Sequence, residues 1–216
     1  MSNRKTPQQI VSDGLWHNNA GLVQLLGLCP LLAISTTLIN ALALALATLV
    51  VLMFSNVIVS LFRRALVRRV RLMFYVVVIA GGVSVVDQWM AAWRYELYQN
   101  LGIFVPLIAT NCAIVARAEL CASHQPPGHA LLDALATGAG FGVLLIVVGG
   151  LREAIGRGAL LTDAHTLFGP AAASWTVQFA DGFLLAVLPP GAFFVLAALV
   201  ATHRALSPRP IEVNTG

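Results

Sequence analysis

The feature that most constrains this chain is a long stretch without charged side chains. No Asp, Glu, Lys or Arg occurs between Asp13 and Arg63. One helix needs only about 20 apolar residues to cross a hydrocarbon core of about 30 Å. The stretch is too long for a single membrane-spanning helix. It therefore predicts two, over residues 21–38 and 41–62, with Asn40 near the turn between them.

The composition extends this prediction to the whole chain. Of the 216 residues, 58% are hydrophobic and 10% are charged, against about 45–50% and about 25% in an ordinary soluble domain. The net charge of +4 is small, and its clustering between apolar runs does not favour nucleic-acid binding. Nothing alternates with the period of two that a β-barrel requires. We therefore predict one all-α integral membrane domain over residues 1–216, surrounded by the lipid bilayer.

Four further apolar segments bring the predicted number of membrane helices to six. They cover residues 72–89, 98–116, 131–150 and 183–202. The polar first 19 residues, and the long apolar run after them, do not have the form of a signal peptide.

The positions of Lys and Arg predict how the helices are oriented, because these residues concentrate on the cytoplasmic side. With the N-terminus inside, ten of them lie inside: Arg4, Lys5, Arg63, Arg64, Arg68, Arg69, Arg71, Arg117, Arg204 and Arg209. Three lie outside: Arg94, Arg152 and Arg157. We therefore expect both termini in the cytoplasm. The basic run 63–71 is then an orienting loop, and the alternative is a patch for nucleic acid or a partner.

The chain has three cysteines, and an odd number argues against a disulfide framework. Cys121 lies just past the fourth apolar segment, on the reducing side. Cys29 and Cys112 lie inside apolar segments. A free cysteine often packs as a small hydrophobic residue, which is one interpretation of both.

Two features favour a functional site at these two cysteines. Cys29 lies in the first helix of the first three-helix half and Cys112 in the first helix of the second, so the halves would be inverted repeats. Pro30 follows Cys29 directly, and Pro106 lies shortly before Cys112. Interrupted helices at matching positions indicate a central site near the bilayer midplane.

Two thiolates do not complete a metal site, because iron–sulfur clusters and structural zinc usually need four ligands. The five histidines all fall at predicted helix ends or in loops: His17, His124, His129, His165 and His203. If Cys29 and Cys112 hold a metal, the remaining ligands must come from another chain.

Charged residues near the predicted spans have more than one interpretation. Intramembrane acids are candidates for ion pathways, and Asp133 is the best placed, at the inner mouth of the fifth segment. Asp87 and Glu119, like Asp133, lie within a turn or two of an interface, where a hydrated carboxylate is equally expected. Arg152 and Glu153 are predicted to form a surface pair beyond the fifth helix.

Glycines in the fifth segment have two interpretations. A nucleotide-binding loop would need a preceding strand. In a membrane helix, the spacing of Gly138 and Gly142 instead predicts close helix packing. The outer loop 151–181 is expected to lie along the interface or to cover a partner.

Several motifs resemble a known family, the membrane subunits of the Rnf and Nqr complexes, and within it the E subunit of the Rnf ion-translocating electron-transport complex. They are G-L-W-H-N-N (14–19), V-Q-L-L-G-L-C-P-L-L (23–32), L-Y-Q-N-L-G-I-F-V-P-L-I-A-T-N-C (97–112), A-R-A-E (116–119), G-G-L-R-E-A-I-G (149–156) and V-L-P-P-G-A-F-F (187–194). The resemblance runs from about residue 8 to 205. It departs at Cys121, where the family usually has an aromatic residue.

The resemblance implies a fold of six helices in two inverted halves, at about 15–95 and 96–205, with helices 1 and 4 broken. It also implies that the homologous A subunit of the complex pairs with this chain. Each of the two would give two cysteines to one shared [2Fe–2S] cluster, and the matching positions here are Cys29 and Cys112. Backbone amides freed near Pro30 and the side chain of Asn111 are candidate donors to the cluster sulfurs. Asn111 is equally expected to cap backbone groups.

The activity that the resemblance implies belongs to a complex in a bacterial inner membrane. That complex moves electrons between ferredoxin and NAD, by way of flavins and further iron–sulfur clusters in the B, C, D and G subunits, coupled to Na⁺ or H⁺ transport. The chain would be one part of this redox-driven translocase and not catalytic alone. The alternatives are a small inverted-repeat carrier with a solute or ion at midplane, and a scaffold subunit without a redox centre.

Overall fold

The computed structural model describes residues 23–63, 70–93, 95–102, 104–160, 177–178 and 182–206. Its elements are α2 (Leu28–Ile34), α3 (Leu38–Phe62), α4 (Arg71–Trp93), α5 (Tyr95–Leu101), the 3₁₀ turn η2 (Val105–Ile108), α6 (Cys112–Arg117), the π-helical turn η3 (Ala118–Ala122), α7 (Pro127–Arg157), β1 (Ala159–Leu160), β2 (Val177–Gln178), α9 (Leu184–Val187) and α10 (Pro189–Leu206). The prediction of a mainly helical fold is confirmed.

Four stretches within these ranges are long and apolar enough to cross a membrane: Leu38–Phe62, Arg71–Trp93, Val105–Ala122 and Pro127–Arg157. They correspond to the second, third, fourth and fifth predicted segments. The arrangement of six spans as two inverted repeats stays a prediction.

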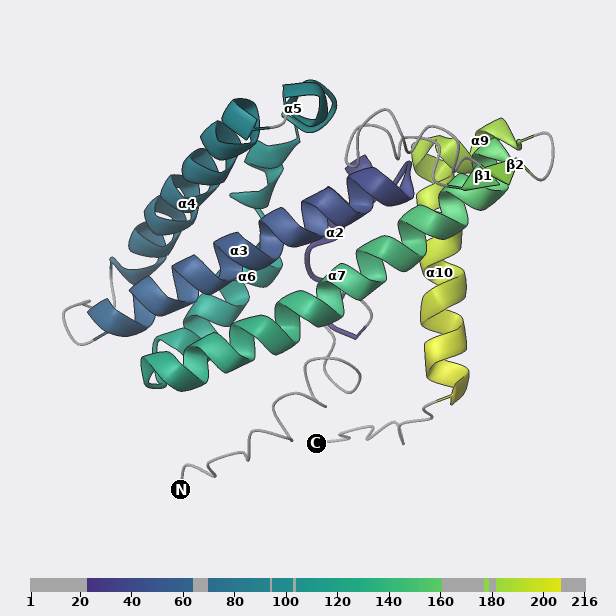
Figure 1. The fold of residues 1–216 in the computed structure, drawn as a ribbon. Coiled ribbons are helices and arrows are strands. Elements are labelled where there is room, and N and C mark those ends of the chain that lie inside the picture. The colour runs from purple at the N-terminus through teal and green to yellow at the C-terminus, as the bar shows by residue number, and fades with distance from the viewer. Residues whose placement is uncertain are drawn as a thin grey trace.

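Helices α3 and α7 form the centre of the fold and lie side by side in opposite directions (Figure 1). Near the end of α3, the Ser60 hydroxyl donates to the carbonyl oxygen of Gln125, just before α7, at 2.6 Å. At the other end, the Leu38 N–H donates to Glu153 Oε2 of α7 at 2.8 Å. The chain therefore crosses the bundle in one direction along α3 and returns along α7.

Small residues bring these two helices close together. A Cβ atom added at Gly138 would lie 3.3 Å from the Leu52 side chain, and one at Gly142 would lie 3.3 Å from Ala45 Cβ. Both distances are too short for a larger side chain without movement of its neighbour. The close packing predicted from the glycine spacing is confirmed. The two backbones approach each other here as small residues allow in other pairs of membrane helices.

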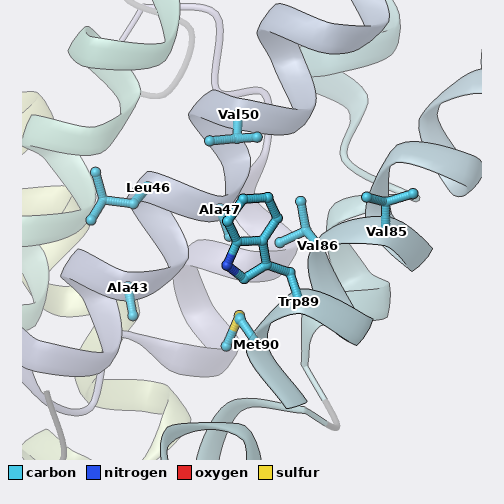
Figure 2. A pocket seen from close by; sticks show the side chains of 8 residues that line it. All are labelled: Ala43, Leu46, Ala47, Val50, Val85, Val86, Trp89 and Met90. Carbon is cyan, nitrogen blue, oxygen red and sulfur yellow. The ribbon is translucent and has the colours of Figure 1, made fainter. Parts of the chain in front are cut away.

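Helix α4 packs against only part of α3 and leaves an apolar groove between them (Figure 2). The groove has a volume of about 420 Å³, and its walls are the side chains of Ala43, Leu46, Ala47, Val50, Val85, Val86, Trp89 and Met90. The Trp89 indole lies across its middle. Such a hydrocarbon surface suits lipid or another membrane helix, and it offers a polar solute few partners.

The last predicted helix, residues 183–202, is interrupted, whereas the apolar run there predicts a continuous one. Helix α9 ends at Val187, and Leu188 is extended, with φ −69° and ψ 158°. The physical reason is the pair Pro189–Pro190. A residue before proline avoids the helical region, and proline is favoured at the first turn of the helix that follows.

Most of the predicted outer loop lies outside the described residues. Its first part does not form a loop, because α7 continues to Arg157. Beyond it, β1 and β2 pair antiparallel, with Ala159 opposite Gln178.

Candidate functional site

The first cysteine lies at the start of a short helix that follows a backbone reversal. Gly27 has φ +75° and precedes α2, in which Cys29 and Pro30 are the second and third residues. This left-handed conformation strains any residue with a Cβ. Pro30 lies in the first turn, where its missing N–H leaves no helical bond unmade. The non-helical stretch covers residues 23–27, where Leu25 also has a positive φ of 53°, and Pro30 helps to begin the helix that follows.

The second cysteine also begins a short helix, but the chain there is shaped by different residues. Pro106 lies in the first turn of η2, and Asn111 is extended, with φ −71° and ψ 109°. Cys112 is the first residue of α6. Asn111 Oδ1 accepts a hydrogen bond from the Ala113 N–H at 3.0 Å and so caps that helix. Of the two roles open for Asn111, the structure shows the capping one.

These two interruptions meet. A Cβ atom at Gly27 would lie 2.8 Å from Asn111 Oδ1 and 3.0 Å from the ring of Phe141. Phe141 lies near the middle of α7, the longest described helix, so the two segments meet beside the midpoint of that helix. Residues close to Cys29 and Cys112 are thus in contact, although the two cysteines are far apart in sequence.

Both thiols at this crossing are accessible from outside the chain. Cys29 and Cys112 are exposed free cysteines, whereas Cys121 is buried. Within the described ranges, no three Cys, His, Asp or Glu side chains gather as a metal-binding group. The interpretation of Cys29 and Cys112 as buried packing residues therefore does not fit the isolated chain. Two soft sulfur donors are exposed, and the described residues add no group of three metal-binding side chains.

Asp133 is not the hydrated acid at a helix mouth that was one expectation. Helix α7 begins at Pro127, and Asp133 is 5% exposed. Its carboxylate forms a two-bond ion pair with Arg117, the last residue of α6. Arg117 Nε donates to Asp133 Oδ2 at 3.0 Å, and a second guanidinium nitrogen donates to Oδ1. The pair neutralises the buried charge and fastens α6 to α7.

Three other residues considered in the sequence analysis differ in how exposed they are. Glu119 is about half exposed and pairs with Arg71 at 3.2 Å. Asp87 is partly buried in α4. Cys121 lies in the π-helical turn η3 and is 7% exposed, so it differs from the two accessible thiols.

The surface pair predicted from Arg152 and Glu153 is wrong. Both residues belong to α7, and their exposed fractions are 1% and 0%. Arg152 donates to the carbonyl oxygens of Ala186, Val187 and Leu188 at 3.1, 2.6 and 3.3 Å. Its buried charge is thus surrounded by the oxygens at the end of α9.

The interrupted sixth segment explains why those oxygens are open to Arg152. In a continuous helix the Ala186 carbonyl would accept from the N–H four residues later, but Pro190 has none. Arg152 supplies the missing donor. The Leu-Pro-Pro sequence was the available signal for this contact. The sequence around Arg152 and Glu153 itself gives no sign of a contact with a segment more than 30 residues away.

The same two charged residues also hold the first cysteine segment. Arg152 donates to Ser35 Oγ at 2.9 Å and to the Leu32 carbonyl at 3.5 Å. Glu153 accepts from the Leu38 N–H, one of the donors at the start of α3 that lacks a partner within the helix. The turn between α2 and α3 is therefore held on both sides by one turn of α7.

Together these features define a class of protein: a multi-pass helical membrane protein with two interrupted segments that meet beside the middle of α7, each with an accessible thiol. A comparison with protein families agrees with that class. The family described as "Rnf-Nqr subunit, membrane protein" matches residues 8–200. The chain belongs to this Rnf-Nqr family.

Curated relatives cover nearly the whole chain, and each is named as the E subunit of an ion-translocating oxidoreductase complex. The chain is 54% identical over 197 residues to the one from Pseudomonas paraeruginosa, a match that covers 90% of this chain and 82% of the relative. The relative from Thioalkalivibrio sulfidiphilus is 52% identical over 94% of this chain and 90% of its own length. That from Shewanella amazonensis is 48% identical over 97% and 90%.

Proposed function

We propose that this chain is the E subunit of an ion-translocating oxidoreductase of the Rnf type. In this role it carries electrons across the membrane through a [2Fe–2S] cluster shared with the homologous A subunit. The observation that carries the proposal is the contact between Gly27 and Asn111, which lie two residues and one residue before the exposed Cys29 and Cys112. The names of the relatives support the assignment to the complex.

The donor set fits such a cluster. Thiolates are the usual ligands of iron–sulfur clusters, and a [2Fe–2S] cluster usually takes four of them. This chain offers two that open outward, so a partner that offers two more would complete the set at the interface. When bound, the cluster would accept and release one electron, which gives a stepping stone within about 30 Å of hydrocarbon.

The surrounding residues of this chain have clear tasks in that arrangement. Leu31, Ile108 and Ile114 are buried beside the two cysteine segments and keep bulk water away from their inner side. Asn111 fixes the start of the helix that carries Cys112. Gly27 allows the two segments to approach each other. Pro30 and Asn111 stay candidates for tuning the hydrogen bonds near the sulfur atoms.

The proposed setting follows the charges of the chain. With the N-terminus inside, ten basic residues fall on the inner side and three on the outer side. We therefore place both termini in the cytoplasm of a bacterial inner membrane. The B, C, D and G subunits, with their flavins and clusters, would connect this chain to ferredoxin and NAD. Transport of Na⁺ or H⁺ would be coupled to that electron flow. Asp133 joins an ion pathway only if Arg117 releases it.

The proposal is tested on the purified complex by low-temperature EPR and iron analysis. Cys29→Ala and Cys112→Ala variants that still assemble should lose one [2Fe–2S] signal, about two irons per complex and electron transfer. Cys121→Ala is the matched control, because this cysteine is buried away from the crossing, and it should keep all three. An unchanged signal and iron content in the first two variants would refute the shared cluster.

The alternatives give different results in the same experiment. A scaffold subunit would keep the complex active after both cysteines are replaced. A solute carrier would bind a substrate when isolated, without any need for its homologous partner. The mainly apolar groove of Figure 2 gives that second alternative little support.

A further inference from the structure

A small cavity lies where α3, α7 and the residue before α6 meet. Its walls are formed by Thr48, Leu52, Asn111, Ala113, Ile114, Thr137, Gly138 and Phe141. About 10 Å³ of it is open to the centre of a water-sized sphere. That is close to the least space that one water molecule needs.

Three polar side chains that line this cavity have atoms without a partner among the described residues. Thr48, Asn111 and Thr137 are 3%, 1% and 2% exposed. The atoms are the two threonine hydroxyl oxygens and Asn111 Nδ2. Buried polar atoms are nearly always hydrogen-bonded, because leaving one unpaired in an apolar interior is costly. Three such atoms from three segments around one cavity therefore indicate a ligand that can bond to all of them.

We propose that this cavity binds a single water molecule. The water accepts a hydrogen bond from Asn111 Nδ2 and donates its two protons to the hydroxyls of Thr48 and Thr137. Three partners are typical of a buried water. A cation of similar size is disfavoured, since no carboxylate lines the cavity in the described residues and the Asn111 amide N–H group carries partial positive charge.

The site ties the cysteine crossing to the two central helices. Asn111 Oδ1 already accepts from the Ala113 N–H, and the water would hold Nδ2 as well. Both ends of the amide would then be fixed next to Cys112. This inference goes beyond the proposed function, because the water would bind whether or not the cysteines hold a cluster.

The experiment compares the complex with Thr48→Val, Thr137→Val and the double variant, in which each hydroxyl is replaced by a methyl group of similar size. Thr202→Val is the matched control, since Thr202 is an exposed helical threonine in α10. The readouts are the thermal unfolding midpoint, with Na⁺ or K⁺ at equal ionic strength, and a structure of the wild-type complex that resolves ordered water.

If water is bound, each single variant should lower the midpoint by about 2–4 °C. The double variant should lower it little further, because the water is already lost. The wild-type structure should show density bonded to all three side chains. Single variants that are unchanged or more stable, with no density, would show a dry cavity and overturn the proposal. Stabilisation by Na⁺ but not K⁺ that disappears in the double variant would overturn it in favour of a cation.

Discussion

The two cysteine segments are fastened to the same helix in opposite ways. At one end of α7, the arginine belongs to the segment: Arg117 of α6 reaches the carboxylate of Asp133. At the other end, the arginine belongs to α7: Arg152 reaches the Leu32 carbonyl and the Ser35 hydroxyl that follow Cys29. One fastening is a neutral ion pair. The other is a cation surrounded by neutral oxygens.

This difference predicts how each segment would respond to loss of its arginine. Removal of one partner from a buried ion pair leaves an uncompensated charge, which costs more than the pair itself contributes. Removal of a cation from a ring of carbonyls leaves several acceptors without donors but no stranded charge. The segment with Cys112 should therefore depend more steeply on its arginine than the segment with Cys29.

The largest effect is expected from Arg117→Gln. Asp133 would stay buried without its partner, and the free energy of unfolding should fall by about 3–5 kcal/mol. The double variant Arg117→Gln/Asp133→Asn should recover much of this loss, because it removes both charges. Thermal unfolding of the purified complex measures both. A double variant as unstable as the single one would contradict the ion-pair account.

Arg152→Gln should have the next largest effect and lower the free energy of unfolding by about 2–3 kcal/mol. The Ala186 and Val187 carbonyls and the oxygens after Cys29 would lose this donor, whereas the Leu188 carbonyl would keep the Gly191 N–H. Arg157→Gln is the control, since that arginine is on the same helix but exposed, and it should change stability by less than about 0.5 kcal/mol. Equal effects of the two variants would show that burial of Arg152 contributes nothing.

Gly27→Ala tests the crossing itself. The new Cβ would occupy a left-handed conformation, and it would lie 2.8 Å from Asn111 Oδ1. A loss of about 2 kcal/mol is expected from the strain and the displaced neighbour. At Gly128 in the first turn of α7, a Cβ meets no atom within 4 Å, so Gly128→Ala should be neutral or stabilising. If Gly27→Ala were as well tolerated, the tight crossing would be refuted.

The smallest effect is expected at the cap of α6. Asn111→Ala removes the acceptor for the Ala113 N–H, and the loss of this cap alone should cost about 1 kcal/mol. Asn111→Ser keeps a capping oxygen and should recover part of that loss. Hydrogen exchange of the Ala113 amide measures the cap directly. Protection that is unchanged in the alanine variant would show that the cap is dispensable.

Features that depend on local sequence were predictable. The four described spans follow from apolar runs of about the length that a membrane crossing needs. Pro30 and Pro106 indicated interruptions near both cysteines, although the first one lies before Pro30. The close approach of α3 and α7 was visible in Gly138 and Gly142. Each of these signals is carried by the residues that form the feature.

Features that depend on distant partners were not predictable. Arg152 looked like a loop residue because the oxygens that surround it come from two other segments. Asp133 looked hydrated because Arg117 lies on a different helix. A charged residue can be buried only where other parts of the chain supply its partners, and a single sequence without a fold does not show which parts those are.

The tight contact of α3 with α7 has a consequence for motion. At Gly138 and Gly142 side chains of α3 pack directly against α7, so we expect this pair to move as one rigid unit. Any rearrangement of the described residues would then take place in the short elements around it, such as α2, η2 and α6. Gly27 would be a pivot of that motion, because rotation of the backbone there breaks few helical hydrogen bonds.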